Sequence, residues 1–229
     1  MSDYYAMIIT AHPDDAEFGI AGTVAKWTGE GKKVVYVVCT SGDKGTDDPK
    51  MSPAKLAGIR EKEQRAAAEL LGVSEVCFLR YKDQSLEDTP QFRKEIVRQI
   101  RTYRPGLVAS SDPYRRYLWH RDHRITGQVV LDAIFPYARD RLAYPDLLKA
   151  GLEPHKVKEI LLWGTEQPDY FSDITETYDL KIQALRCHHS QLDMHPTEWE
   201  TWVRQRCEAA GKEKGYKLAE AFHHVEISW

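Results

Sequence analysis

The chain has 229 residues, with 32 Lys and Arg against 35 Asp and Glu, which gives a formal net charge of −3. This length predicts one domain spanning residues 1–229 with a sizeable core, and the dispersed charge excludes the basic stripe that nucleic-acid binding requires. No apolar run approaches the roughly 18 residues of a membrane helix, and the first residues do not form a secretory signal. We therefore expect a cytoplasmic protein without a membrane span.

Strand and helix patterns alternate along most of the chain. Short apolar, often β-branched runs predict strands at Met7–Thr10, Val34–Cys39, Val76–Leu79, Leu107–Ser110 and Glu159–Trp163. Amphipathic stretches predict helices over about 16–29, 53–71, 91–103, 123–133, 176–187 and 197–210. This alternation is typical of the α/β class, with a doubly wound, mostly parallel sheet that carries helices on both faces. The first five strands are expected in the spatial order 3-2-1-4-5.

Two short patterns combine histidine with carboxylate. His12-Pro13-Asp14-Asp15 directly follows the first predicted strand, and His120-Arg121-Asp122-His123 follows the fourth strand after a longer loop. In a doubly wound sheet, ligands bind at the carboxyl ends of the strands, where the strand order reverses. Strands one and four are neighbours at that point, so we expect both patterns to meet in one crevice.

The residue types in these patterns suit a metal ion. His12, Asp15 and His123 offer two imidazoles and one carboxylate, a set that leaves positions open for water and substrate. A lone histidine or aspartate pair at a helix start is more often a cap or a surface residue. Two such clusters at neighbouring strand ends favour metal binding, although the same donor set is found in iron(II) oxygenases.

The remaining acid and imidazole groups predict catalytic roles. Asp14, beside the proposed ligand Asp15, is placed to act as a general base on the attacking water; the alternative is that it only caps the following helix. His120 is placed to stabilise a developing oxyanion or to donate a proton to the leaving amine. Asp122 is expected either to orient an imidazole of the site or to be the N-cap of its helix.

The segment Ala11–Gly19, together with His120–His123, resembles the PIG-L/LmbE-like family of zinc-dependent N-deacetylases that act on N-acetylglucosaminyl compounds. The segments Thr40–Asp43 and Leu185–Gln191 also resemble the family. The resemblance implies a Rossmann-like fold and one Zn²⁺ per chain, with Fe²⁺ as the alternative. Arg121 stands where the family often has proline, which leaves the ligand set intact.

The family resemblance also implies the role of each site residue. His12, Asp15 and His123 would be the zinc ligands and Asp14 the general base, which agrees with the chemical reasoning above. His120 would be the oxyanion partner or acid.

Two further residues are candidates for substrate binding. Arg60 resembles the arginine with which the family contacts substrate, and the alternative is a solvated residue on a charged helix. His188, in Cys187-His188-His189, is placed to reach the site from a late helix, and the alternative is simple packing.

The site residues predict a metal-dependent hydrolase, and the family resemblance implies a zinc-dependent enzyme that removes the acetyl group from an N-acetylglucosamine-type amino sugar or glycoconjugate. Two alternatives stay open: an amidase of a thiol-sugar conjugate, and a non-catalytic Rossmann-like ligand-binding module. The second is weakened because the first strand-helix turn lacks the G-x-G-x-x-G pattern. The expected partner is a small molecule, and the family leads us to expect a homo-oligomer.

Overall fold

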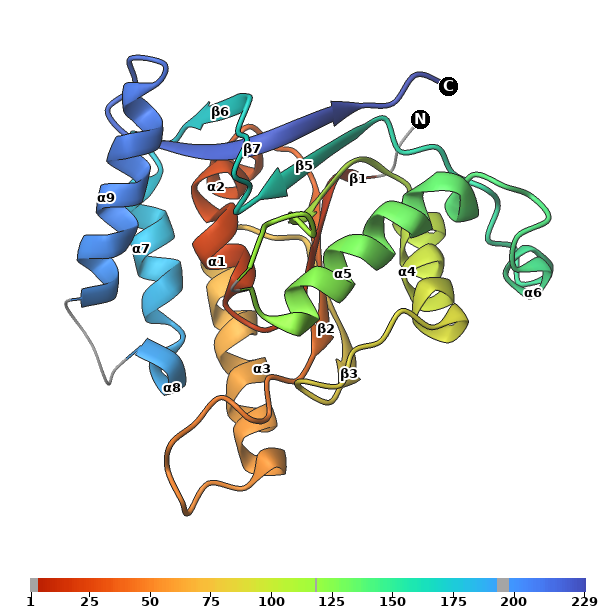
Figure 1. Ribbon diagram of the computed structural model, residues 1–229, viewed down its shortest axis with the longest axis horizontal. Coiled ribbons are helices and arrows are strands. Elements are labelled where there is room, and N and C mark those ends of the chain that lie inside the picture. Colours follow the sequence, from red (N-terminus) through yellow and green to blue (C-terminus); the bar gives the residue numbers. More distant parts are fainter. Residues whose placement is uncertain (1–3, 118, 193–197) are drawn as a thin grey trace.

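One seven-stranded sheet organises the protein (Figure 1). The structure is a computed structural model and describes residues 4–117, 119–192 and 198–229. The strand order is β3-β2-β1-β4-β5-β7-β6, and β1 to β5 are parallel in the predicted order 3-2-1-4-5. The strands are β1 (Tyr4–Thr10), β2 (Val34–Thr40), β3 (Glu75–Tyr81), β4 (Pro105–Ser111), β5 (Glu159–Trp163), β6 (Tyr170–Asp173) and β7 (Ala219–Glu226).

Helices cover both faces of this sheet, which confirms the doubly wound α/β architecture (Figure 1). One face packs against α4 and α5, and the other against α1, α2, α3 and α7. The helices are α1 (Asp15–Gly19), α2 (Ala21–Gly29), α3 (Pro53–Leu70), α4 (Pro90–Tyr103), α5 (Arg121–Asp132), α6 (Pro145–Lys149), α7 (Tyr178–Arg186), α8 (His189–Leu192) and α9 (Glu198–Lys212), with a π-helical turn η1 (Ala133–Ala138) after α5. No helix in these described ranges is long and apolar enough to cross a bilayer.

The alternation of side chains along the central strands builds two cores. In β1, Met7 and Ile9 join the α4–α5 core, whereas Ala6 and Ile8 join the core under α1, α2 and α3. All seven residues of β2 are buried, as expected for a β-branched strand covered on both faces. The central strands are therefore packed on both faces up to the carboxyl edge that carries the two histidine patterns.

The helix predicted over 16–29 is wrong in one respect, because it is two helices. The chain leaves helical geometry at Ile20, with φ −148° and ψ 6°. The freed carbonyls of Glu17 and Phe18 accept hydrogen bonds from Lys181 Nζ at 2.9 Å each. The break between the two helices is stabilised by Lys181, which lies more than 160 residues further along the chain. The sequence pattern of residues 16–29 therefore does not predict it.

The opposite side of the break is held by a carboxylate. Glu220 accepts the backbone N–H groups of Gly22 and Thr23 at 3.0 and 2.8 Å, and so caps the amino end of α2. Lys181 and Glu220 also form a fully buried ion pair, with 2.7 Å between Nζ and Oε1. The pair therefore joins α7 and β7 to the junction between α1 and α2.

Two strands were not predicted. β7 lies antiparallel between β5 and β6, and both pairings extend the sheet beyond the parallel part. The β7 segment carries Glu220, His223, His224 and Glu226, so it lacks the apolar run of a buried strand. Only its position in the sheet makes it a strand.

Replacing Lys181 with methionine tests the role of this ion pair. We expect Lys181→Met to lower the free energy of unfolding by about 3–5 kcal/mol, because Glu220 is left buried without its counter-charge. The double variant Lys181→Met/Glu220→Gln should be more stable than Lys181→Met alone, since the unpaired charge is gone. Urea denaturation followed by circular dichroism measures both; equal stability of the single and double variants would contradict the assignment.

Candidate metal and catalytic site

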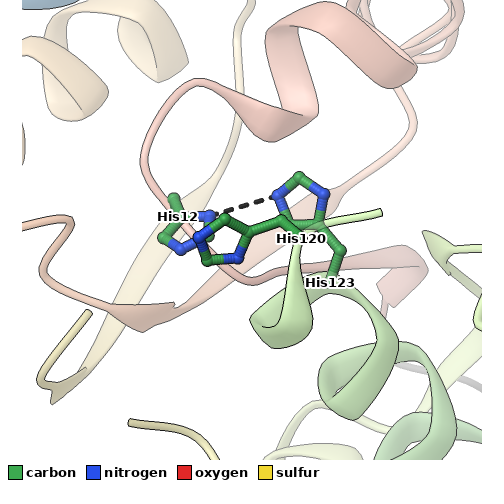
Figure 2. A group of neighbouring side chains, drawn as sticks. All are labelled: His12, His120 and His123. Atoms are coloured by element: carbon green, nitrogen blue, oxygen red, sulfur yellow. Dashed lines mark hydrogen bonds between the residues drawn. The ribbon is translucent and has the colours of Figure 1, made fainter. Parts of the chain in front are cut away.

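The two histidine patterns meet at the carboxyl edge of the sheet. β1 and β4 are hydrogen-bonded neighbours, so the turn after β1 and the loop that leads from β4 into α5 leave the sheet side by side. Figure 2 shows the three imidazoles of His12, His120 and His123 grouped at this point. His12 comes from the turn after β1, whereas His120 and His123 come from the start of α5.

The donor atoms of the three predicted metal ligands converge. His12 Nδ1 lies 3.1 Å from His123 Nε2, the contact drawn as a dashed line in Figure 2. Asp15 completes the group, with Oδ1 3.0 Å from His123 Nε2 and Oδ2 3.5 Å from His12 Nδ1. Donors that bind one zinc ion tetrahedrally at about 2.0–2.1 Å lie roughly 3.3 Å from each other. The residues present therefore fit a metal ion with nitrogen and oxygen ligands.

The second nitrogen of His12 faces two further carboxylates. His12 Nε2 lies 3.0 Å from Asp83 Oδ1 and 3.4 Å from Asp122 Oδ2. These three residues also lie close enough together to be considered as a metal site. However, the Asp122 oxygens already accept the backbone N–H groups of Gln84 and Leu86 at 2.7 and 3.3 Å. A proton on Nε2 that points at these carboxylates leaves Nδ1 free to bind metal.

Asp83 is a residue that the sequence motifs missed. It lies in the loop after β3, outside both histidine patterns. Its side chain is buried, and burial by itself would raise its pKa, but the hydrogen bond with His12 lowers the pKa below its usual value. A lone aspartate in a polar loop carries no spacing signal, so only the fold could bring it to His12.

Asp122 is not the N-cap of α5, so that alternative is wrong. His120 occupies the N-cap position, and its Nδ1 accepts the backbone N–H of Asp122 at 3.1 Å. Asp122 is fully buried in the first turn and faces His12. This is the geometry expected of a carboxylate that orients an imidazole ligand.

Three carboxylates, those of Asp15, Asp83 and Asp122, surround the buried imidazole of His12. Burial by itself would lower the pKa of His12, yet the surrounding carboxylates raise it well above its usual value. Burial would raise the pKa of Asp15, but the two facing histidines lower it well below its usual value. Such a site favours a bound cation.

The tautomer of His120 follows from its contact with Asp122. Since Nδ1 accepts a backbone N–H, the neutral ring carries its proton on Nε2. Partial burial lowers the pKa of His120, and the nearby His12 ring lowers it further. Its ring packs edge-on against His12, with 4.7 Å between the ring centroids. His120 therefore presents an N–H donor beside the converging ligand atoms.

Asp14 lies next to these groups in an unusual backbone conformation. Its φ of 90° and ψ of −23° are left-handed values that residues other than glycine rarely adopt. It stands at the N-cap position of α1 but makes no side-chain capping hydrogen bond within the described chain, so the alternative of a simple cap is wrong. Burial raises the pKa of the Asp14 carboxyl above its usual value, although Arg60 opposes the shift.

Arg60 is buried, so the alternative of a solvated arginine is wrong. Its guanidinium donates to Pro13 O at 2.6 Å, to Gly42 O at 3.0 Å and to Asp14 Oδ2 at 3.1 Å. These contacts hold the turn after β1 against the loop after β2. Substrate contact by Arg60 stays a prediction.

His188 lies between α7 and α8 with no exposed surface. Its Nε2 is 3.2 Å from Oε2 of Glu17, a residue of α1 whose other carboxylate oxygen accepts a hydrogen bond from Gln64 of α3. Its predicted contact with substrate also stays a prediction. Five of the other predicted site residues form one connected group of contacts: His12, Asp15, His120, Asp122 and His123. Arg60 contacts Asp14, which precedes Asp15 in the chain.

A mostly parallel sheet with a histidine and carboxylate cluster at its switch point defines an α/β protein with a candidate metal site. The family model described as "PIG-L: GlcNAc-PI de-N-acetylase" matches residues 7–134, and the chain belongs to this family.

Relatives along nearly the whole chain agree with the family assignment. The chain is 37% identical to the diacetylchitobiose deacetylase of Thermococcus kodakarensis over 220 residues, which are 96% of this chain and 82% of that protein. It is 28% identical to a probable N-acetyl-α-D-glucosaminyl L-malate deacetylase of Bacillus anthracis, over 86% of this chain and 85% of that protein. The solved N,N'-diacetylchitobiose deacetylase of Pyrococcus horikoshii superposes with a TM-score of 0.93 at 33% identity, covering 97% of this chain and 84% of that chain.

Gly42 provides a test of how Arg60 is held. Its φ is +59°, and a Cβ at this position would lie 2.3 Å from Arg60 Nη1. We expect Gly42→Ala to lower the free energy of unfolding by about 1–3 kcal/mol. Gly58→Ala is the matched control, because no atom lies within 4 Å of its Cβ position in α3; alanine there should be stabilising by about 0.5–1 kcal/mol. Urea denaturation measures both, and an equal effect of the two substitutions would contradict the steric argument.

Proposed function

We propose that the protein is a zinc-dependent N-deacetylase that hydrolyses the N-acetyl group of an N-acetylglucosamine-type amino sugar or glycoconjugate. The observation that carries the proposal is the convergence of His12 Nδ1, Asp15 and His123 Nε2 within 3.0–3.5 Å of one another. The Asp14 carboxylate lies on the adjacent residue. Relatives named as a diacetylchitobiose deacetylase and as a probable N-acetyl-α-D-glucosaminyl L-malate deacetylase support the reaction and the sugar class.

His12, Asp15 and His123 would hold one zinc ion per chain, with iron(II) as the alternative. A zinc ion bound there supplies Lewis-acid polarisation of the amide carbonyl and lowers the pKa of the attacking water. Asp122 and Asp83 would act on His12 from its other nitrogen and keep Nδ1 directed at the ion.

Asp14 is the proposed general base. It takes a proton from the attacking water while the water oxygen forms its bond to the amide carbon. The raised pKa of Asp14 suits this role, because a weakly basic carboxylate removes protons poorly. When the carbon–nitrogen bond breaks, the same proton is available to the departing nitrogen, and the products are acetate and a free amino sugar.

His120 is the proposed partner of the developing oxyanion. Its Nε2–H is free for this contact because Nδ1 is engaged by the Asp122 N–H. A neutral imidazole donor that is held in place before reaction stabilises negative charge where the charge develops. Proton donation to the amine would require the charged ring, and the lowered pKa of His120 favours the hydrogen-bonding role.

The other expected functions differ in what they require. An iron(II) oxygenase has no use for a base such as Asp14 beside the ligands, and an amidase of thiol-sugar conjugates would share the site but change the acyl group. Amine release from a panel of N-acetylglucosamine, N,N'-diacetylchitobiose and longer chitooligomers separates these possibilities.

The homo-oligomer expected from the family also stays a prediction.

Replacing Asp14 with asparagine tests the base. We expect Asp14→Asn to lower kcat for the best substrate of the panel by roughly 10²- to 10⁴-fold, since the amide cannot accept the proton. Zinc content by elemental analysis should stay at the level of the unchanged protein. Asp48→Asn, in an exposed part of the loop after β2, is the matched control and should keep full activity. Unchanged turnover of zinc-loaded Asp14→Asn would remove Asp14 from the mechanism.

Removal of the metal tests the ligand set. Dialysis against a chelator should abolish amine release, and added Zn²⁺ or Fe²⁺ should restore it according to which ion the enzyme uses. His123→Ala should retain less metal after the same purification, because the site loses one of three donors. Full activity in protein shown to be free of metal would exclude the proposal, and failure to bind any metal would favour a ligand-binding module.

A further inference from the structure

The backbone of Asp14 needs support from outside the turn. Its left-handed conformation is unfavourable for an aspartate and persists only where the surrounding structure holds it. The Asp14 N–H donates to the side-chain oxygen of Gln64, with 3.0 Å between N and Oε1. The proposed base therefore takes its orientation in part from a side chain on α3.

Gln64 is in turn held by a buried carboxylate. Its Nε2 donates to Glu17 Oε1 at 2.9 Å, while the other oxygen of Glu17 lies 3.2 Å from His188 Nε2. Glu17, Gln64 and His188 all have no exposed surface. Because a carboxylate only accepts, the amide of Gln64 has to turn its NH₂ group to Glu17 and its oxygen to Asp14.

This row of contacts crosses three helical segments. Glu17 belongs to α1, Gln64 to α3, and His188 follows α7. Lys181 adds a bond to the main-chain oxygen of Glu17 and so fixes the same helix from α7. The contacts between these helices therefore end at one backbone group of the turn after β1, the N–H of Asp14.

We propose that Gln64, Glu17 and His188 are positioning residues that hold Asp14 in the orientation needed for catalysis. The inference rests on the proposed role of Asp14 as the general base. All three side chains are fully buried, and their contacts lead to the N–H of Asp14, so we expect them to affect the reaction through Asp14. His188 thereby has a function that does not require contact with substrate.

The test compares variants that remove or keep the hydrogen bonds. Gln64→Met preserves side-chain length and removes both contacts; we expect kcat to fall roughly 10- to 100-fold, as for a misplaced catalytic group. KM should change by no more than about twofold, since substrate binding is untouched. Zinc content should be unchanged. His188→Leu should also lower kcat, whereas His188→Gln, which keeps an N–H donor for Glu17, should restore most of it.

Leu56→Ala controls for a general loosening of α3. Leu56 is buried in the same helix but belongs to no contact of this row, so its variant should lose stability and keep kcat. Normal kcat in folded Gln64→Met, or an equal loss of kcat in Leu56→Ala, would overturn the proposal. If Gln64→Met does not fold, the contrast between His188→Leu and His188→Gln decides in its place.

A double variant separates this proposal from the proposed function. If the row acts through Asp14, then Asp14→Asn/Gln64→Met should have the kcat of Asp14→Asn alone, because the orientation of an absent base no longer matters. Wild-type turnover in Asp14→Asn would contradict the base itself. A large loss in Asp14→Asn together with additive losses in the double variant would overturn only the positioning role.

Discussion

The pairing of β1 with β4 is the constraint on which the site depends. The two strands run parallel from Tyr4 opposite Pro105 to Ile8 opposite Ala109, and Ser110 Oγ adds a bond to the Ile9 carbonyl at 2.9 Å. Neighbouring strands lie about 4.8 Å apart, so residues a hundred positions apart in the chain leave the sheet together. Without this register, the donor nitrogens of His12 and His123 would not converge.

Several carboxylates of the site lie where water is largely excluded. Each of those named below has a positively charged group, an imidazole or a backbone N–H as a partner. Arg60 lies against Asp14, the two facing histidines against Asp15, and backbone N–H groups against Asp122. These partners come from different helices and loops, so we expect the buried carboxylates to be stable only when the helices are packed on the sheet. Buried charges without such partners would be strongly destabilising.

The two ring nitrogens of His12 have different roles, as imidazole chemistry allows. One nitrogen faces the predicted ligands and the other faces Asp83 and Asp122, so the carboxylates beyond the ligand set decide which nitrogen is free. His120 repeats this logic, because its engagement with the Asp122 N–H leaves Nε2–H as a donor. The proposal of hydrolysis rests on Asp14 beside the donor set and on these tautomers rather than on the fold, since folds of this class serve many chemistries.

Apolar runs and short spacings are local signals, so they were enough to predict the order of the five parallel strands, which the structure confirms, and to propose His12, Asp15 and His123 as ligands. Tertiary structure alone decided the features whose partners are distant. Asp83 reaches His12 without any motif, Arg60 is buried rather than solvated, and helix 16–29 breaks at Ile20 because Lys181 and Glu220 hold its two parts. β7 is a strand only through its neighbours, since its polar residues lack a core pattern. Contacts between residues 18 to 198 positions apart, from Arg60 with Gly42 to Glu220 with Gly22, leave no periodicity in the chain, so only the folded structure reveals them.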